Sequence, residues 1–145
     1  MVQKKRKIAI LGTGNVGATI AYNLVVQGVC SEIVLVDINK EKALGEAMDL
    51  NHGISFGPTK IDIKAGDYHD CKDAKIVVIS AGANQNVGET RMDLIYKNNN
   101  IFKSIVEQVM QSGFKGIFII ATNPDVEGEA TAMYASHKVA LLKKI

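Results

Sequence analysis

The sequence predicts an α/β fold built on a doubly wound parallel sheet, with helices on both faces. Three observations support this prediction. Short apolar segments alternate along the chain with longer segments of helical periodicity. A glycine-rich turn follows the first apolar segment, and an acidic residue ends the second. The 145 residues are close to the length of one domain, so we expect residues 1–145 to form a single domain without an internal linker.

The first predicted strand, residues 7–11, runs directly into the glycine-rich turn. Gly12, Gly14 and Gly17 follow with the spacing G-x-G-x-x-G, and a helix that ends near Gly28 begins there. The first glycine permits the tight turn, the second lets a pyrophosphate approach the backbone, and the third lets the helix pack close to the strand. A plain tight turn can have the same pattern, so the spacing alone is a weak signal. The residues predicted to contact a dinucleotide here are Gly12, Gly14, Asn15, Val16 and Gly17.

The second predicted strand, residues 32–36, ends in an acidic residue. Asp37 lies 20 residues after Gly17, where a carboxylate can accept a hydrogen bond from the 2′-OH of an adenosine ribose. It could also cap the helix that begins near Lys40. Strand, glycine turn, helix, strand and acid in this order predict a Rossmann-like, dinucleotide-binding domain. Because no arginine follows Asp37 directly, we expect NAD rather than NADP as the cofactor.

The remaining segments continue the alternation of strands and helices. Residues 40–50 and 91–111 have helical periodicity, whereas residues 61–63, 75–80 and 116–121 are short segments typical of strands. Right-handed crossovers then predict five strands in the order 3-2-1-4-5.

Two further segments complete the prediction. The polar loop 81–90 follows the fourth strand, and ligands bind at the carboxyl ends of strands in such sheets, so Ala81 and Gly82 are predicted to contact the cofactor. Residues 126–143 form a last helix that should cover strands four and five. Its predicted inner face consists of Val126, Ala130, Met133, His137 and Leu141.

The composition excludes several classes of protein. Apolar residues make up 47% and charged residues 22%, which is ordinary for a globular domain and argues against disorder. A net charge of +2 is too small to indicate a nucleic-acid or membrane partner, and no apolar segment approaches the ~18 residues of a membrane span. Cys30 and Cys71 lack the spacing of a disulfide framework or a zinc site. We therefore expect a cytoplasmic protein with reduced thiols and no metal site.

Several motifs resemble the cofactor domain of bacterial L-lactate dehydrogenases, within the lactate/malate dehydrogenase family. The resemblance covers residues 7–124. It rests on the segments 12–18, 36–37, 45–50, 81–83, 88–91 and 121–124. It implies NAD as the cofactor and a small-molecule dinucleotide as the partner. Dehydrogenases of this type assemble through their helices, so the resemblance also makes a homo-oligomer plausible.

The resemblance also implies roles for three residues near the ends of strands. Gln85 matches a glutamine that favours lactate and pyruvate over a dicarboxylate, Arg91 an arginine that polarises the reacting carbonyl, and Asn123 an asparagine that contacts the carbonyl and the nicotinamide. On the residues alone, ordinary roles are favoured for all three, as a loop glutamine, a first-turn helix arginine and a turn asparagine. The family's catalytic histidine has no match among the three histidines here. We therefore expect an inactive NAD-binding domain, with an enzyme that pairs with a missing substrate domain as the alternative.

The last part of the chain departs from the dehydrogenase pattern. Residues 123–132 instead resemble the Toprim domain of RecR-type recombination-mediator proteins, which implies a seam near residues 121–125 and a chimera, designed or selected, of two α/β domains. Asp125, Glu127 and Glu129 could then form a Toprim-like Mg²⁺ site, because hard oxygen ligands suit that ion. Such sites also need an acid at the end of the first strand, where this chain has its glycine turn. A structural scaffold that holds no ligand is a further alternative.

Overall fold

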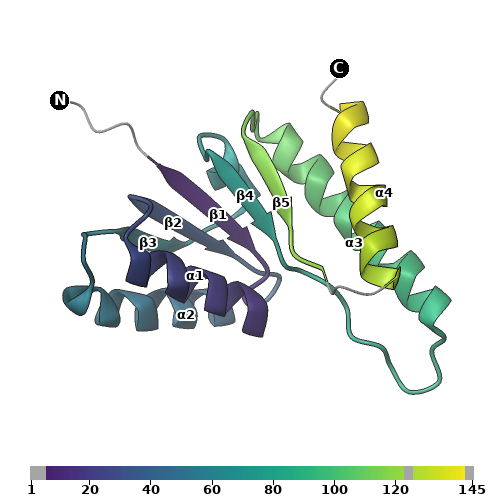
Figure 1. Cartoon of the computed structure of the whole chain (residues 1–145), viewed down its shortest axis with the longest axis horizontal. Coiled ribbons are helices and arrows are strands. Elements are labelled where there is room, and N and C mark those ends of the chain that lie inside the picture. Colours follow the sequence, from purple (N-terminus) through teal and green to yellow (C-terminus); the bar gives the residue numbers. More distant parts are fainter. Residues whose placement is uncertain (1–5, 123–125, 143–145) are drawn as a thin grey trace.

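The structure is a computed structural model that describes residues 6–122 and 126–142, without the side chains of residues 126, 127 and 142. Its elements are β1 (Lys7–Leu11), α1 (Asn15–Gln27), β2 (Glu32–Val36), α2 (Lys40–Gly53), η1 (Ile54–Phe56), β3 (Asp62–Ala65), η2 (Tyr68–Cys71), β4 (Ile76–Ile79), α3 (Arg91–Gln111), β5 (Ile117–Ile120) and α4 (Val126–Leu142). The five strands form one parallel sheet in the order β3-β2-β1-β4-β5 (Figure 1). The predicted fold class and strand order are therefore confirmed.

The sheet is organised around β1, which pairs with β2 on one side and with β4 on the other. All residues of β1 and β2 are buried, as expected for central parallel strands that are covered on both faces. The register places Leu11 opposite both Val36 and Ile79, so the three strands end at the same edge. The glycine turn, Asp37 and the loop after β4 consequently meet there.

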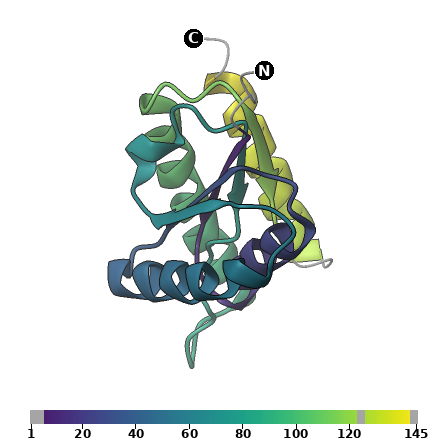
Figure 2. The same cartoon turned by 90° about the vertical axis from the view of Figure 1, so that its left-hand side faces the viewer.

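The helices form one layer on each face of the sheet. α1 and α2 lie over one face, and α3 and α4 lie over the other (Figure 1, Figure 2). Each layer has its own apolar core, with Ile10, Leu35 and Ala21 on the first side and Val77 and Val106 on the second. Within the described part of the chain, no helix has the length and apolarity that crossing a bilayer requires.

The face that α4 presents to the protein differs from the predicted one. Four residues of the predicted inner face are exposed: Ala130, Met133, His137 and Leu141. Thr131 and Ala135 are buried instead, and Val139 packs against the core, while the side chain of Val126 lies outside the described residues. α4 packs mainly along α3, and small residues allow two helices to approach closely. Apolar residues occur on several sides of α4, so their periodicity does not single out this face.

Candidate functional site

The turn between β1 and α1 contains two glycines that the fold requires and one that it does not. Gly12 has a positive φ of 96°, and a Cβ there would lie 2.7 Å from the backbone nitrogen of Ala81. A Cβ on Gly17 would collide with the carbonyl oxygen of Gly12. A Cβ on Gly14, in contrast, would meet no described atom within 4 Å. Gly14 thus leaves open space at the start of α1, which is the space that a bound phosphate group needs.

The Asp37 carboxylate, directly after β2, is hydrogen-bonded to this turn. Its Oδ2 accepts from the backbone N–H of Thr13 at 2.7 Å and from the Thr13 hydroxyl at 3.0 Å, and its Oδ1 accepts from the backbone N–H of Asn39 at 2.9 Å. Burial acts to raise the pKa of Asp37, but these hydrogen bonds outweigh it and hold the pKa below its ordinary value. Asn39 rather than Asp37 caps α2. Asp37 is therefore an anion at neutral pH, and about one of its roughly four acceptor sites remains for a ligand.

A cavity of about 990 Å³ opens beside this turn, and we call it the larger cavity. Of the predicted cofactor residues, it is lined by Gly12, Gly14, Asp37, Ala81 and Gly82. Its volume is in the range of cofactor sites. Further walls come from η2 and α3, where Tyr68, Lys97, Asn100, Ile101 and Ser104 line it. The sequence pattern did not indicate these five, because they reach the cavity only through the packing of η2 and the rotation of α3 about its axis.

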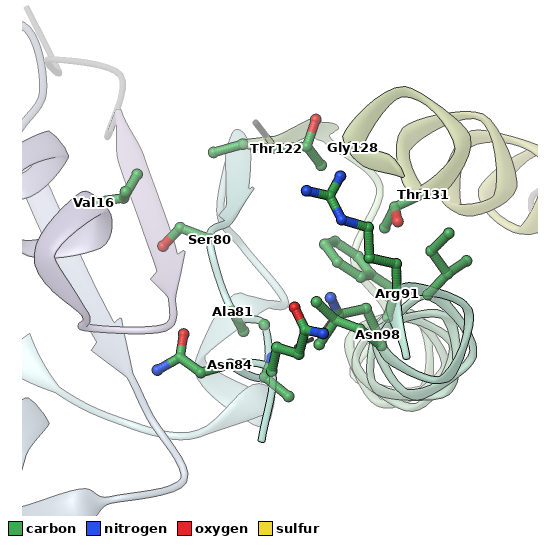
Figure 3. Close-up of a pocket in the computed structure, with 16 residues that line it drawn as sticks. Val16, Ser80, Ala81, Asn84, Arg91, Asn98, Thr122, Gly128 and Thr131 are labelled. Atoms are coloured by element: carbon green, nitrogen blue, oxygen red, sulfur yellow. Dashed lines mark hydrogen bonds between the residues drawn. The ribbon is translucent and has the colours of Figure 1, made fainter. Parts of the chain in front are cut away.

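A smaller cavity of about 420 Å³ adjoins the first along residues 80–82 (Figure 3). Val16, Gln85 and Arg91 line it, together with residues of α3 and α4. The Arg91 side chain extends from the start of α3 toward the first turn of α4 (Figure 3). Gln85 and Arg91, to which the resemblance assigns roles in substrate chemistry, thus share this cavity. Asp37 lines only the larger one.

The loop between β4 and α3 is hydrogen-bonded largely to itself. The Gln85 side-chain amide donates to the carbonyl oxygen of Glu89 at 2.7 Å. The Glu89 carboxylate accepts from the backbone and the side-chain amide of Asn86 at 2.9 and 3.0 Å, and Lys97 Nζ lies 3.5 Å from it. The hydrogen bond from the Asn86 backbone is the main cause that holds the pKa of Glu89 below its ordinary value. The Gln85 amide is therefore engaged within its own loop, although the residue lines the cavity.

Two of the predicted site residues that the structure describes are not among the walls of these two cavities. Asn15 is exposed at the start of α1 and lines neither of these two cavities. Gly17 is buried beneath the glycine turn, where it serves the packing of α1 rather than contact with a ligand. Asn123 lies outside the described residues.

The acids of the predicted Toprim-like site can be located only in part. Asp125 and the side chain of Glu127 lie outside the described residues, and Glu129 is exposed on α4. Within residues 6–122 and 126–142, no group of three or more His, Cys, Asp or Glu side chains is placed to hold a metal ion. The structure therefore offers no observation that favours a metal site.

Comparison with known proteins shows similarity over most of the chain. The model of the lactate/malate dehydrogenase NAD-binding domain matches residues 6–144. An L-lactate dehydrogenase of Geobacillus is 59% identical over 122 residues, which are 84% of this chain and 38% of that relative. Another from Halalkalibacterium halodurans is 54% identical over 131 residues, which are 90% of this chain and 42% of that relative. The chain thus spans about two fifths of the length of these relatives.

Solved structures show the same similarity. A lactate dehydrogenase from a deep-sea metagenome library superposes with a TM-score of 0.87 at 52% identity, covering 95% of this chain and 43% of that one. A malate dehydrogenase from Picrophilus torridus superposes with a TM-score of 0.83 at 28% identity, covering 94% of this chain and 43% of that one. The likeness therefore extends over nearly all of the present chain.

Proposed function

The chain belongs to the lactate/malate dehydrogenase family, and on that premise we propose that it binds NAD(H) in the larger cavity. One observation carries the proposal: open space at Gly14, at the start of α1, lies in the same cavity as the ionised Asp37 carboxylate. The turn would hold the pyrophosphate and Asp37 the adenosine ribose. When bound, NAD would supply the hydride chemistry, and this chain would supply its binding site.

Asp37 also determines the expected preference for NAD(H) over NADP(H). A carboxylate accepts hydrogen bonds from ribose hydroxyls but repels a 2′-phosphate. Lys40 and Lys42 line the same cavity, so the preference depends on Asp37 staying in place beside them.

Titration that follows NADH fluorescence tests the proposal. We expect saturable binding with Kd of about 10 μM to 1 mM, with NADPH at least about tenfold weaker. Equal or tighter binding of NADPH would contradict the role given to Asp37. A scaffold without a ligand predicts no saturable binding of either nucleotide.

The Geobacillus and Halalkalibacterium relatives are named as lactate dehydrogenases, so catalysis by this chain has to be considered separately from cofactor binding. The 145 residues alone are proposed to bind the cofactor without interconverting lactate and pyruvate at a measurable rate. His52, His69 and His137 are all exposed and line neither cavity, so none of these three is placed to donate a proton there. Positioned acid–base groups contribute about 10²–10⁴-fold in rate. Pyruvate-dependent oxidation of NADH by pure protein, lost in Arg91→Ala, would favour the active alternative.

The seam near residues 121–125 and the chimeric origin stay predictions. The family model covers residues 6–144, and so it covers both sides of that seam. The single-domain organisation is retained as part of the proposal, since α4 and β5 contribute to one core cluster through Ala135 and Phe118.

A further inference from the structure

Thr13 is a buried polar residue that the proposed function leaves without a role. It lies in the glycine turn between Gly12 and Gly14, and none of its surface is exposed. Both of its donors, the backbone N–H and the hydroxyl, reach the same oxygen of Asp37, at 2.7 and 3.0 Å. A buried hydroxyl needs a partner, and a hydrogen bond to an ionised one is stronger than an ordinary one. The Thr13–Asp37 pair therefore joins the phosphate-binding turn to the acid at the end of β2.

This pair constrains the orientation of the carboxylate before any ligand arrives. Thr13 holds Oδ2 and the Asn39 backbone holds Oδ1, so the Asp37 side chain is fixed at both oxygens. Without the hydroxyl, Oδ2 would retain one neutral backbone donor, and the carboxylate could rotate or lean away from the ribose. A fixed carboxylate discriminates between a hydroxyl and a phosphate better than a mobile one, because a mobile one can move away from the phosphate.

We propose that Thr13 is a positioning residue that sets nucleotide specificity: its hydroxyl holds the Asp37 carboxylate where it accepts a ribose 2′-OH and excludes a 2′-phosphate. This inference rests on the proposed binding of NAD(H). Thr13 acts through Asp37 and need not touch the ligand itself.

Ser80 provides a matched comparison, because its hydroxyl is also bonded to the glycine turn but, in the described residues, not to Asp37. Its hydroxyl donates to the carbonyl oxygen of Gly12 at 2.9 Å, so it fastens the same turn from the end of β4. No hydrogen bond joins Ser80 to Asp37 among those found in the described residues. Loss of either hydroxyl should loosen the turn, but only the loss from Thr13 should alter the carboxylate.

The test measures Kd for NADH and for NADPH in Thr13→Val, Thr13→Ser and Ser80→Ala, with melting as a check of folding. Thr13→Val should reduce the preference for NADH over NADPH about three- to tenfold, less than the full value of a hydrogen bond to a charged group, because Oδ2 keeps its bond to the Thr13 backbone N–H. Thr13→Ser should restore the preference. Ser80→Ala should weaken both nucleotides equally and leave the ratio unchanged. Thr13→Ala replaces Thr13→Val if the latter does not fold.

Two outcomes separate this inference from the proposed function. If the unchanged protein binds neither nucleotide, the proposed function fails. If it binds NADH and Thr13→Val keeps the same NADH to NADPH ratio, only the role of Thr13 fails. NMR titration of the Asp37 carboxyl in ligand-free protein gives a second readout. Its pKa should rise in Thr13→Val and not in Ser80→Ala, and an unchanged value would overturn the inference.

Discussion

The two cavities share a wall at residues 80–82, but different kinds of structure hold them. The larger one is formed by the ends of buried strands and by a turn that Thr13 ties to Asp37. The smaller one depends on the loop after β4, in which Gln85 and Asn86 are hydrogen-bonded to a residue of the same loop. The first is therefore coupled to the folding of the sheet. The loop of the second is tied to α3 where the Ala83 N–H donates to Asn98 Oδ1, and its outer part is held by local, exposed contacts.

This difference in how the two cavities are held predicts which of them tolerates substitution. Hydrogen bonds between exposed groups contribute little to stability, and loops held by them open at low cost. Gly12, Gly14 and Asp37, which are predicted to bind the cofactor, line only the larger cavity, whereas Gln85 and Arg91 line only the smaller one. The predicted cofactor residue Val16 also lines the smaller cavity. Cofactor binding should thus be robust to changes in the smaller cavity and sensitive to changes in the larger one. Four experiments test this comparison.

Gly14→Val should have the largest effect. The valine side chain would fill the open space at the start of α1, and NADH binding should weaken by about 100-fold or more. No described atom lies within 4 Å of a Cβ at this position, so the fold should persist. Fluorescence titration measures the binding, and circular dichroism measures the fold.

Gly45→Val is the matched control for this variant. Gly45 lies on α2, and a Cβ there also meets nothing within 4 Å, but the residue lines neither cavity. The same substitution should leave NADH binding unchanged. If Gly14→Val binds NADH as tightly as the unchanged protein, the larger cavity is not the cofactor site.

Removal of residues 126–145 should have the next largest effect, and it should act on stability. α4 lines only the smaller of the two cavities, but Ala135 and Val139 pack in a core cluster with Phe118 and Ile120 of β5. The truncation would uncover Phe118 and Ile120, and full burial of a large apolar side chain contributes roughly 1.5–3 kcal/mol, so the free energy of unfolding should fall by up to about 3–6 kcal/mol. A domain of this size has only about 5–15 kcal/mol in total, so aggregation or loss of cooperative melting is expected.

The acids at the start of α4 supply the control. Glu127→Gln combined with Glu129→Gln should leave both melting and NADH binding nearly unchanged, because a charge at the start of a helix contributes only about 0.3–1 kcal/mol. A truncated protein that melts like the full chain would show that α4 is not docked. A Mg²⁺-dependent change in melting that the double variant removes would favour the Toprim-like alternative.

Part of the larger cavity could be predicted from the sequence, because a short motif and the end of a strand form it. The glycine spacing determines the turn, and the end of a predicted strand locates Asp37, so Gly12, Gly14 and Asp37 could be brought together from the pattern alone. Tyr68 and Lys97 could not, since their approach to the cavity depends on tertiary packing. The role of Thr13 could not be predicted either, because the glycine pattern places no requirement on the residue between Gly12 and Gly14.

The second half of the sheet was harder to predict. Every residue of β5 is apolar, which is typical of a strand covered on both faces. In the described residues, however, Ile117 and Ile119 are 64% and 46% exposed, while Phe118 and Ile120 pack inward. A sequence pattern predicts which faces of a strand or helix are apolar. It does not predict which of these faces is covered by another helix or strand. The same limit explains the wrong inner face predicted for α4.

Arg91→Ala should have a small effect on cofactor binding. Arg91 lines the smaller cavity and not the larger one, so its loss removes no wall of the proposed cofactor site. The Kd for NADH should therefore stay within about twofold of the unchanged value by fluorescence titration. Asp37→Ala, measured alongside, should weaken binding clearly. A tenfold loss in Arg91→Ala would mean that the two cavities act as one site.

Glu89→Gln should have the smallest effect and should act mainly on the loop, because its contact with Lys97 of the larger cavity is long and partly exposed. The Glu89 carboxylate holds the backbone and side chain of Asn86 and lies near Lys97, and all of these contacts are exposed or partly exposed. A neutral amide would weaken each of them without breaking the capping box that starts α3. We expect thermolysin to cleave before the fully exposed Val87 about two- to fivefold faster, with melting unchanged.

The same substitution elsewhere on α3, Glu107→Gln, should leave cleavage before Val87 unchanged, because Glu107 is remote from the loop in sequence and lines neither cavity. NADH binding should be unaffected in both variants. If Glu89→Gln weakened NADH binding as much as Gly14→Val, the loop would be part of the cofactor site. The separation between a cavity maintained by the sheet and one maintained by the loop would then be wrong, since loosening only the loop would have disrupted both.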